Sequence, residues 1–249
     1  MTTSKPDLSH AIRVFVEGFS LGKSRTHPYE AVQFGEVWAM RDLPRRNPRD
    51  YRKEEWIAWK TEPAEVDALA RKETRGRFFI CSVTTTDAEQ LERKATYKQL
   101  GYRLLATEPF FEHDLKRIPR AESPAEIVHV TTPELARDLA AWTRTRPIPA
   151  EQLGGAAPFR QYIARVAGQV VGRVRSINAA GSTWCSDLHV HEEARRKGIG
   201  RALLARMLAD DRRRGARSSV LLSSHTGALL YPQAGYRQLG MLSIFAPRR

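Results

Sequence analysis

The segment Leu188-His-Val-His-Glu-Glu-Ala-Arg-Arg-Lys-Gly-Ile-Gly-Arg-Ala-Leu-Leu204 decides how the C-terminal half of this chain folds. An apolar run from Trp184 to Val190 predicts a strand, which leads into a basic turn with two glycines and then a helix from Gly198 to about Arg214. The first N–H groups of a helix have no internal partner and lie at the positive end of its dipole, so this turn is suited to binding phosphate.

The composition of the turn strengthens this interpretation. Gly198 and Gly200 allow positive φ or a close approach of the backbone to an anion. Four basic side chains add positive charge: Arg195, Arg196, Lys197 and Arg201. In the helix that follows, Leu203/Met207 and Leu204/Leu208 are pairs four residues apart that would face a sheet.

At this point the chain resembles the GNAT superfamily of N-acetyltransferases. The family signature, Arg or Gln-x-x-Gly-x-Gly or Ala, is met as Arg195-Arg-Lys-Gly198-Ile-Gly200. Further on, Leu230-Tyr-Pro-Gln-Ala-Gly-Tyr236 is similar to the family's Leu-Tyr-x-x-x-Gly-Phe, with Tyr in the Phe position. The resemblance implies an α/β fold with a mixed, mostly antiparallel sheet flanked by helices. In such a fold two neighbouring parallel strands, here Trp184–Val190 and Ser218–Leu222, splay apart.

The resemblance also implies acetyl-CoA as co-substrate, with direct acyl transfer to a primary amine of a small molecule or peptide. Pantetheine would lie in the gap between the splayed strands and pair with backbone near Leu188 and Val190. The pyrophosphate would sit on the amides of Arg196, Lys197, Gly198, Ile199, Gly200 and Arg201. Ser224 stands where many family members have an Asn that contacts the cofactor, which is a departure from the pattern.

Candidate catalytic residues follow from the same chemistry. The family uses a tyrosine at the position of Tyr231 to protonate the leaving thiolate, and a phenol remains protonated at neutral pH. The alternative is that Tyr231 packs in the core. Asp187 and His189 are candidates for the base that takes the amine proton, because on a regular strand they share a face. The backbone N–H of Val190 is a candidate donor to the oxyanion.

The histidines and cysteines of the chain predict neither a metal site nor a disulfide. His189 and His191 could share one strand face as metal ligands, but no third ligand is evident, so no metal is predicted. Cys81 and Cys185 each lie in an apolar segment, which favours two buried thiols and a reducing cytoplasm.

The positive charge of the chain is concentrated in one segment. Its formal charge is +13, and the segment Arg195 to Arg217 contributes nine basic and two acidic residues, or +7, which leaves +6 for the other 226 residues. Such concentration favours a local anionic ligand over a long phosphate backbone. The basic stretch from Arg41 to Lys53 is loop-like and either contacts an anionic substrate or is solvated.

The sequence is therefore compatible with three functions. The leading one is a cytoplasmic acetyl-CoA-dependent N-acetyltransferase, active as a monomer or homodimer and without a membrane segment. The alternatives are a non-catalytic acyl-CoA-binding sensor and a basic nucleic-acid-binding protein, of which the second is disfavoured by the charge distribution.

An internal repeat suggests two related halves in tandem. Tyr97-Lys-Gln-Leu-Gly-Tyr-Arg-Leu-Leu105 recurs as Tyr231-Pro-Gln-Ala-Gly-Tyr-Arg-Gln-Leu239. Residues 1–116 contain no Gly-x-Gly, so we expect a degenerate GNAT-like domain without a cofactor loop. A Pro-punctuated linker, 117–125, and a catalytic GNAT domain, 126–249, would follow. The alternative is an unrelated N-terminal domain.

The hydrophobic patterns predict strands and helices in an alternating order. The strands expected are Phe34–Met40, Phe78–Thr84, Tyr102–Ala106, Glu126–Val130, Phe159–Val166, Val170–Ile177, Trp184–Val190, Ser218–Leu222 and Tyr236–Phe245. The helices expected are Ala64–Thr74, Asp87–Leu100, Pro133–Arg144, Gly198–Arg214 and one that ends near Ala234.

Overall fold

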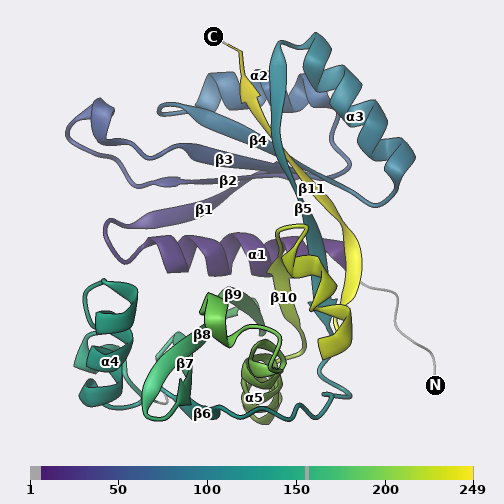
Figure 1. The fold of residues 1–249 in the computed structure, drawn as a ribbon. Helices are drawn as coiled ribbons and strands as arrows, with labels where there is room; N and C mark the ends of the chain where they lie inside the picture. The colour runs from purple at the N-terminus through teal and green to yellow at the C-terminus, as the bar shows by residue number, and fades with distance from the viewer. Residues whose placement is uncertain (1–6, 155–156, 249) are drawn as a thin grey trace. The chain divides into compact units, whose positions relative to one another are not determined.

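The computed structural model describes residues 7–154 and 157–248, and the chain divides into two compact units. The first comprises Met1–Phe111, Leu222–Ala228 and Gln238–Arg249, and the second comprises Glu112–Leu221 and Leu229–Arg237. The units therefore differ from a simple division at 117–125, because the end of the chain returns to the first unit (Figure 1).

The first unit has a mixed sheet whose strand order is β1-β2-β3-β4-β11-β5. Strands β3 and β4 are parallel, and β11 is antiparallel to β4. Its elements are α1 (Leu8–Lys23), β1 (Tyr29–Phe34), β2 (Val37–Asp42), β3 (Glu54–Ala58), α2 (Pro63–Glu73), β4 (Phe78–Thr84), α3 (Asp87–Gln99), β5 (Tyr102–His113) and β11 (Arg237–Pro247).

Three features of the first unit differ from the sequence expectations, and one of them is strand β3, which was not predicted. Helix α1 was not predicted, although it has a capping Asp7 and buries one apolar side that includes Ile12 and Phe15. The single strand expected at Phe34–Met40 is instead the end of β1, a two-residue turn and most of β2, which form a hairpin. Gly35 adopts φ +59° there, so the chain reverses between β1 and β2.

The second unit has the strand order β10-β9-β8-β7-β6, antiparallel except for the parallel pair of β9 and β10. Its main elements are β6 (Glu126–His129), α4 (Pro133–Thr143), β7 (Phe159–Val166), β8 (Gln169–Ala179), β9 (Ser182–Val190), α5 (Ile199–Arg213) and β10 (Ser219–Leu222). The helix expected to end near Ala234 is wrong: only the short 3₁₀ turns η4 (Gly227–Leu229) and η5 (Pro232–Ala234) form there. Pro232 lacks an N–H donor and disfavours a continuous helix.

Helix α5 is fixed against one face of the second sheet by both apolar and ionic contacts. Leu203, Leu204, Met207 and Leu208 are fully buried, as the spacing predicted. One turn later, the buried carboxylate of Asp211 accepts hydrogen bonds from Arg160 of β7 (2.7 Å), Ser176 of β8 (2.8 Å) and Thr183 of β9 (2.9 Å). A single side chain thus ties three strands to the helix.

The sequence repeat has the same local structure in both units. Tyr97 and Tyr102 form a T-shaped ring pair with centroids 5.7 Å apart at 75°, and Tyr231 and Tyr236 form one at 5.6 Å and 75°. The glycine between each pair has positive φ, +84° at Gly101 and +91° in the second copy. The repeat is therefore a conserved turn geometry within this chain as well as a sequence match.

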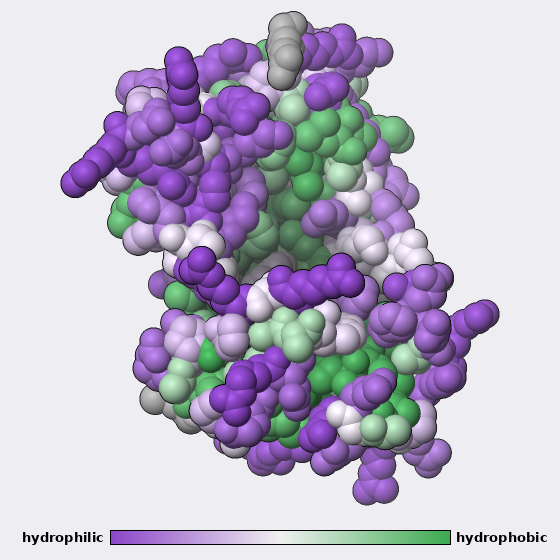
Figure 2. All heavy atoms as spheres, turned by 60° about the vertical axis from the view of Figure 1, so that its left-hand side comes forward, coloured by the Kyte–Doolittle hydropathy of each residue, from purple (hydrophilic) through white to green (hydrophobic). Residues whose placement is uncertain are grey.

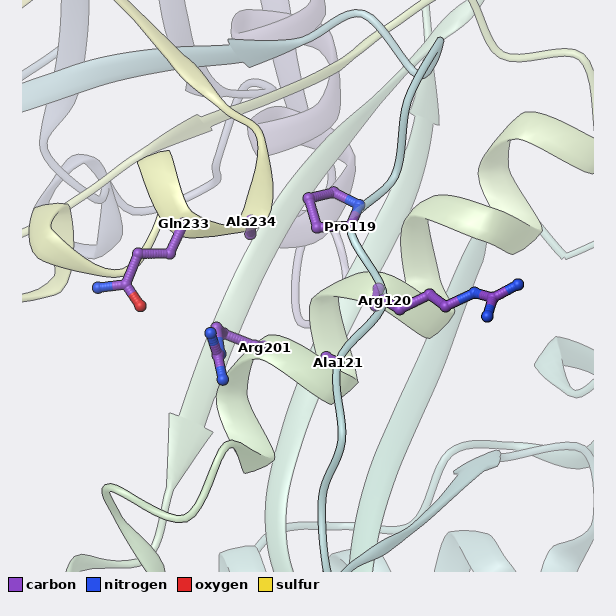
Figure 3. A pocket seen from close by; sticks show the side chains of 7 residues that line it. Pro119, Arg120, Ala121, Arg201, Gln233 and Ala234 are labelled. Carbon is purple, nitrogen blue, oxygen red and sulfur yellow. The ribbon is translucent and has the colours of Figure 1, made fainter.

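The predicted linker is part of the second unit, and residues 119–122 lie against helix α5 and its start. Figure 3 shows its backbone passing across helix α5, where Pro119, Arg120 and Ala121 line a small hollow together with Arg201, Ala205, Gln233 and Ala234. Arg212 of α5 donates to the carbonyl of Lys116 at 3.2 Å. A Cβ on Gly198 would stand 2.5 Å from the carbonyl oxygen of Glu122, so the linker and the start of α5 are in direct contact.

We expect Asp211→Ala to lower the free energy of unfolding by about 3 to 5 kcal/mol, because it leaves the guanidinium of Arg160 buried without its carboxylate. Denaturant titration followed by circular dichroism measures this. Arg137→Ala is the matched control: its ion pair with Glu134 is exposed, and its loss should cost at most about 1 kcal/mol. Equal unfolding midpoints for the two variants would contradict the assignment.

We also expect Gly198→Ala to destabilise the protein in the absence of any ligand. Gly215 has a similar φ, +80° against +78°, but nothing lies within 4 Å of its Cβ position. Gly215→Ala should therefore cost only the conformational strain, about 1 to 2 kcal/mol. Gly198→Ala should cost more because of the contact with Glu122. Equal losses, measured by thermal unfolding, would show that the linker does not press on this glycine.

Candidate functional site

The parallel strands β9 and β10 pair only at their beginning. Thr183 is opposite Ser219 and Trp184 is opposite Val220, and no later pair is formed among the residues that the structure describes. Strand β9 nevertheless continues to Val190, still paired with β8 on its other side. The predicted splay between these strands is therefore present, and it leaves one edge of β9 without a strand partner.

The turn after β9 presents backbone N–H groups at the start of α5. Arg196 and Gly198 have positive φ, +62° and +78°. Within the described parts of the chain, no hydrogen bond from the N–H groups of residues 196–198 is found, and the first N–H groups of α5 have no partner inside the helix. No acidic residue lies in the first turn of α5. This end of the helix is suited to an anion.

Arg195 stabilises the end of the strand. Its Nε donates to the carbonyl of Val190 at 3.0 Å, so the side chain spans the turn. The side chains of Arg196, Lys197 and Arg201 are exposed. Of the four basic residues predicted to bind phosphate, one therefore holds the backbone of the turn, and three extend toward solvent.

Gly198 and Gly200 serve different purposes. Gly198 supplies the positive φ that was predicted, but the close neighbour of its Cα is the carbonyl of Glu122. Gly200 lies inside α5 with ordinary helical φ, and a Cβ there would stand 3.2 Å from the side chain of Leu230 and 3.9 Å from that of Val190. Gly200 therefore lets three segments meet: the end of β9, the start of α5 and the segment before Tyr231.

Tyr231 follows Leu230 directly and is mostly buried, with 8% of its surface exposed. Its ring packs edge-on against Tyr236, whose hydroxyl is 2.9 Å from the hydroxyl of Ser219 at the start of β10. The structure thus places Tyr231 beside the strand that diverges from β9. Both readings of this residue, general acid and core aromatic, are compatible with its position.

Asp187 and His189 lie on a part of β9 where the regular alternation of side chains between the two faces is interrupted. Arg173 of β8 is opposite His189 and Arg175 is opposite Ser186, so β9 has one extra residue between these pairs. Asp187 has φ +59°, which marks a β-bulge. The expectation of a regular strand is wrong here.

The bulge engages Asp187 in a strong ion pair. The two terminal oxygens of Asp187 accept from Nε and a terminal nitrogen of Arg173 at 2.8 and 2.7 Å. Arg175 adds a longer contact of 3.5 Å. Both oxygens of Asp187 thus already accept hydrogen bonds from guanidinium groups, which leaves fewer lone pairs for a substrate amine.

His189 is better suited to that role. Its ring lies 5.6 Å from the ring of Trp142 on α4. Partial burial, together with the positive charges of Arg173 and Arg195, lowers the pKa of His189 below its usual 6.5. The imidazole is therefore neutral at pH 7, and one ring nitrogen can accept a proton.

Ser224 belongs to the first unit, whereas the residues described above belong to the second. Its hydroxyl accepts a hydrogen bond from the N–H of Gly227 at 3.2 Å, and its carbonyl accepts from Ser223 at 2.7 Å. Ser224 thus shapes a local turn, and its contact with a cofactor stays a prediction.

Among the described residues, no group of three or more His, Cys, Asp or Glu side chains is arranged to hold a metal ion. None of the helices described has the length and apolar character needed to cross a membrane. Cys81 and Cys185 are both buried free thiols, as expected.

Three of the six basic residues between Arg41 and Lys53 form internal ion pairs. Arg45 and Arg52 donate to the buried carboxylate of Asp42 at 2.7 Å each, and Arg41 contacts Glu30 at 3.3 Å. Burial would raise the pKa of Asp42, but the hydrogen bonds from Arg45 and Arg52 outweigh it and lower that pKa to about 2. On the face drawn in Figure 2, hydrophilic residues are widely spread. These arginines stabilise the first unit.

The first unit also contains a parallel strand pair, and these two strands do not splay apart. Strands β3 and β4 are paired at five consecutive positions, from Glu54/Phe78 to Ala58/Ser82. Helix α2 follows β3 as α5 follows β9, but it begins at Pro63, which has no N–H, and Glu65 lies in its first turn. Both features are unfavourable for an anion at this helix start.

Comparison with known proteins agrees with this description. Residues 158–238 match the family model of the acetyltransferase (GNAT) domain. No curated protein matches the chain. Among solved structures, a GCN5-related N-acetyltransferase from Kribbella flavida has a TM-score of 0.65 at 14% identity, covering 96% of each chain.

Two further solved structures are similar over nearly the whole length. A GCN5-related N-acetyltransferase from Sphaerobacter thermophilus gives a TM-score of 0.56 at 17% identity, over 95% of this chain and 91% of that one. A tandem GNAT protein from the clavulanic acid biosynthesis pathway gives 0.51 at 13%, over 96% and 94%. The chain therefore has the GNAT fold, and its residues 158–238 match the model of the acetyltransferase (GNAT) domain.

Proposed function

We propose that this protein transfers an acetyl group from acetyl-CoA to a primary amine. The observation that carries the proposal is the unpaired edge of β9 beyond Trp184, which leads directly to the free N–H groups at the start of α5. An extended thiol-bearing arm has backbone to pair with along this edge. A pyrophosphate has amide donors and the basic side chains Arg196, Lys197 and Arg201 at its end.

The backbone of Val190 is oriented for a role in this gap. The next residue, His191, donates its N–H to Val171 of β8 at 2.7 Å. Because successive N–H groups of a strand point in opposite directions, the N–H of Val190 points to the edge that β10 leaves open. This group can donate to the carbonyl oxygen of the thioester as negative charge develops on it.

The proton transfers are assigned to two side chains. The neutral amine attacks the carbonyl carbon of the thioester, and His189, alone or through water, takes the proton that the nitrogen loses. The carbon–sulfur bond then breaks, and Tyr231 donates its phenolic proton to the departing thiolate. Asp187 acts through Arg173, which it holds in place, and the chemistry needs no metal.

The first unit is proposed to be a GNAT-like copy that binds no cofactor. The shared repeat, the matching tyrosine pairs and the same order of strands and helix around β3 and β4 support kinship. The closed pairing of β3 with β4 and the start of α2 at Pro63 support the loss of binding. We therefore expect one cofactor site per chain.

Calorimetric titration with acetyl-CoA should give one site per chain. Arg196→Gln/Lys197→Gln, which removes two charges beside the proposed pyrophosphate, should raise Kd by about tenfold or more through lost electrostatic attraction. Arg212→Gln/Arg213→Gln is the matched control, because it removes two charges roughly 20 Å away at the other end of α5. Equal effects of the two double variants, or two sites per chain, would contradict the proposed cofactor site.

Tyr231→Phe should lower kcat about 10- to 1000-fold, because it keeps the ring and removes only the proton donor. The Kd for acetyl-CoA should change little. Tyr97→Phe is the matched control, since Tyr97 is the equivalent residue of the repeat and lies in the core of the first unit. Full activity in Tyr231→Phe would assign this residue to packing. Tight acetyl-CoA binding without turnover on any amine would favour the sensor.

A further inference from the structure

A cluster of charged and aromatic side chains lies on the face of the second sheet opposite α5. It consists of Arg173 and Arg175 of β8, Asp187 and His189 of β9, and Trp142 of α4, and we call it the arginine cluster. Ser176 of β8 points to Asp211 on α5. Because side chains alternate along a strand, Arg173 and Arg175 point to the other face. A molecule that approaches His189 therefore meets this cluster.

The arginine cluster carries excess positive charge. Asp187 is its only carboxylate, and both of its oxygens are already bound by Arg173. Arg175 donates its Nε to the neutral side chain of Gln161 at 2.9 Å and contacts Asp187 at 3.5 Å. His189 is neutral at pH 7, as argued above. Two guanidinium charges thus face one carboxylate, while the side chains of Arg173 and Arg175 keep 23% and 17% of their surface exposed.

Trp142 contacts both Arg173 and the proposed base, His189. The guanidinium carbon of Arg173 lies 5.3 Å from the centre of the Trp142 ring, and the His189 ring lies 5.6 Å from it. Arg173 and His189 are direct register partners on adjacent strands. Directly opposed side chains begin about 5 Å apart, so a small molecule can reach both at once.

We propose that the amine acceptor is a small molecule with a carboxylate close to its amino group, as in an α- or β-amino acid. Its carboxylate binds Arg173, where a guanidinium offers further N–H donors beside those used by Asp187, and its amino group faces His189. Trp142 forms an apolar wall beside both. Polyamines and lysine-rich peptides are disfavoured because their positive charge meets the two arginines. This inference rests on the proposed acetyl transfer.

The test uses pairs of amines that differ in the carboxylate alone: glycine, β-alanine, leucine, phenylalanine and glutamate, each against its C-terminal carboxamide. Their binding to the full-length protein saturated with CoA is measured by calorimetry, and turnover of acetyl-CoA is measured with the same panel. We expect the acid of at least one pair to bind ten times or more tightly than its amide. Arg173→Gln should abolish that preference and leave CoA affinity within about twofold.

Arg165→Gln is the matched control, since Arg165 of β7 donates only to the carbonyl of Gly168 among the hydrogen bonds described. It should leave the preference for the acid unchanged. Equal affinity within every pair, tighter binding of the amides, absence of binding by any acid, or a preference that survives Arg173→Gln would each overturn the inference. Failure of the proposed function is separate: CoA itself would then not bind, or no amine, charged or neutral, would be acetylated.

Discussion

The pairing of β9 with β10 ends after Val220, and the rest of the candidate site depends on this interruption. If the two strands stayed paired, the backbone of Leu188 and Val190 would be used within the sheet, as in any parallel pair. The strands are held at their other end by Thr183, which both pairs with Ser219 and donates to Asp211. The buried carboxylate therefore fixes the point from which β9 and β10 separate.

The contacts that hold α5 on the sheet also fix the position of its first turn. Helix α5 is held at its far end by Asp211 and along its length by four buried apolar residues, so its first turn has little freedom. Gly200 lets Leu230 and Val190 pack closely at that turn, and Gly198 accommodates the carbonyl of Glu122. The turn before α5 is thus positioned by contacts on several sides, which is what preorganisation of the proposed anion site requires.

Each unit contains two parallel strands joined by a helix, and the two strand pairs differ in how far they stay paired. In the first, β3 and β4 remain paired, α2 begins with a proline, and Tyr97 lies in the core beside Phe245. In the second, β9 and β10 part after two paired positions, and α5 is preceded by Gly198 at its N-cap. The final strand, β11, pairs with β4 and completes the sheet of the first unit. A fragment limited to residues 120–249 would therefore lose the pairing partner of its last strand.

The sequence by itself determined the strand–turn–helix around Arg195–Gly200, the buried face of α5, most of the strands of the second unit, and the repeated tyrosine turn. These features depend on local periodicity and on glycine, which residues near in sequence fix. It did not determine the bulge at Asp187, because an extra residue in a strand is defined only against the partner strand. For the same reason the arginine cluster was missed: Trp142, Arg173 and His189 come together only when α4, β8 and β9 pack. The role of Gly198 was likewise decided by a contact with Glu122, 76 residues earlier in the chain.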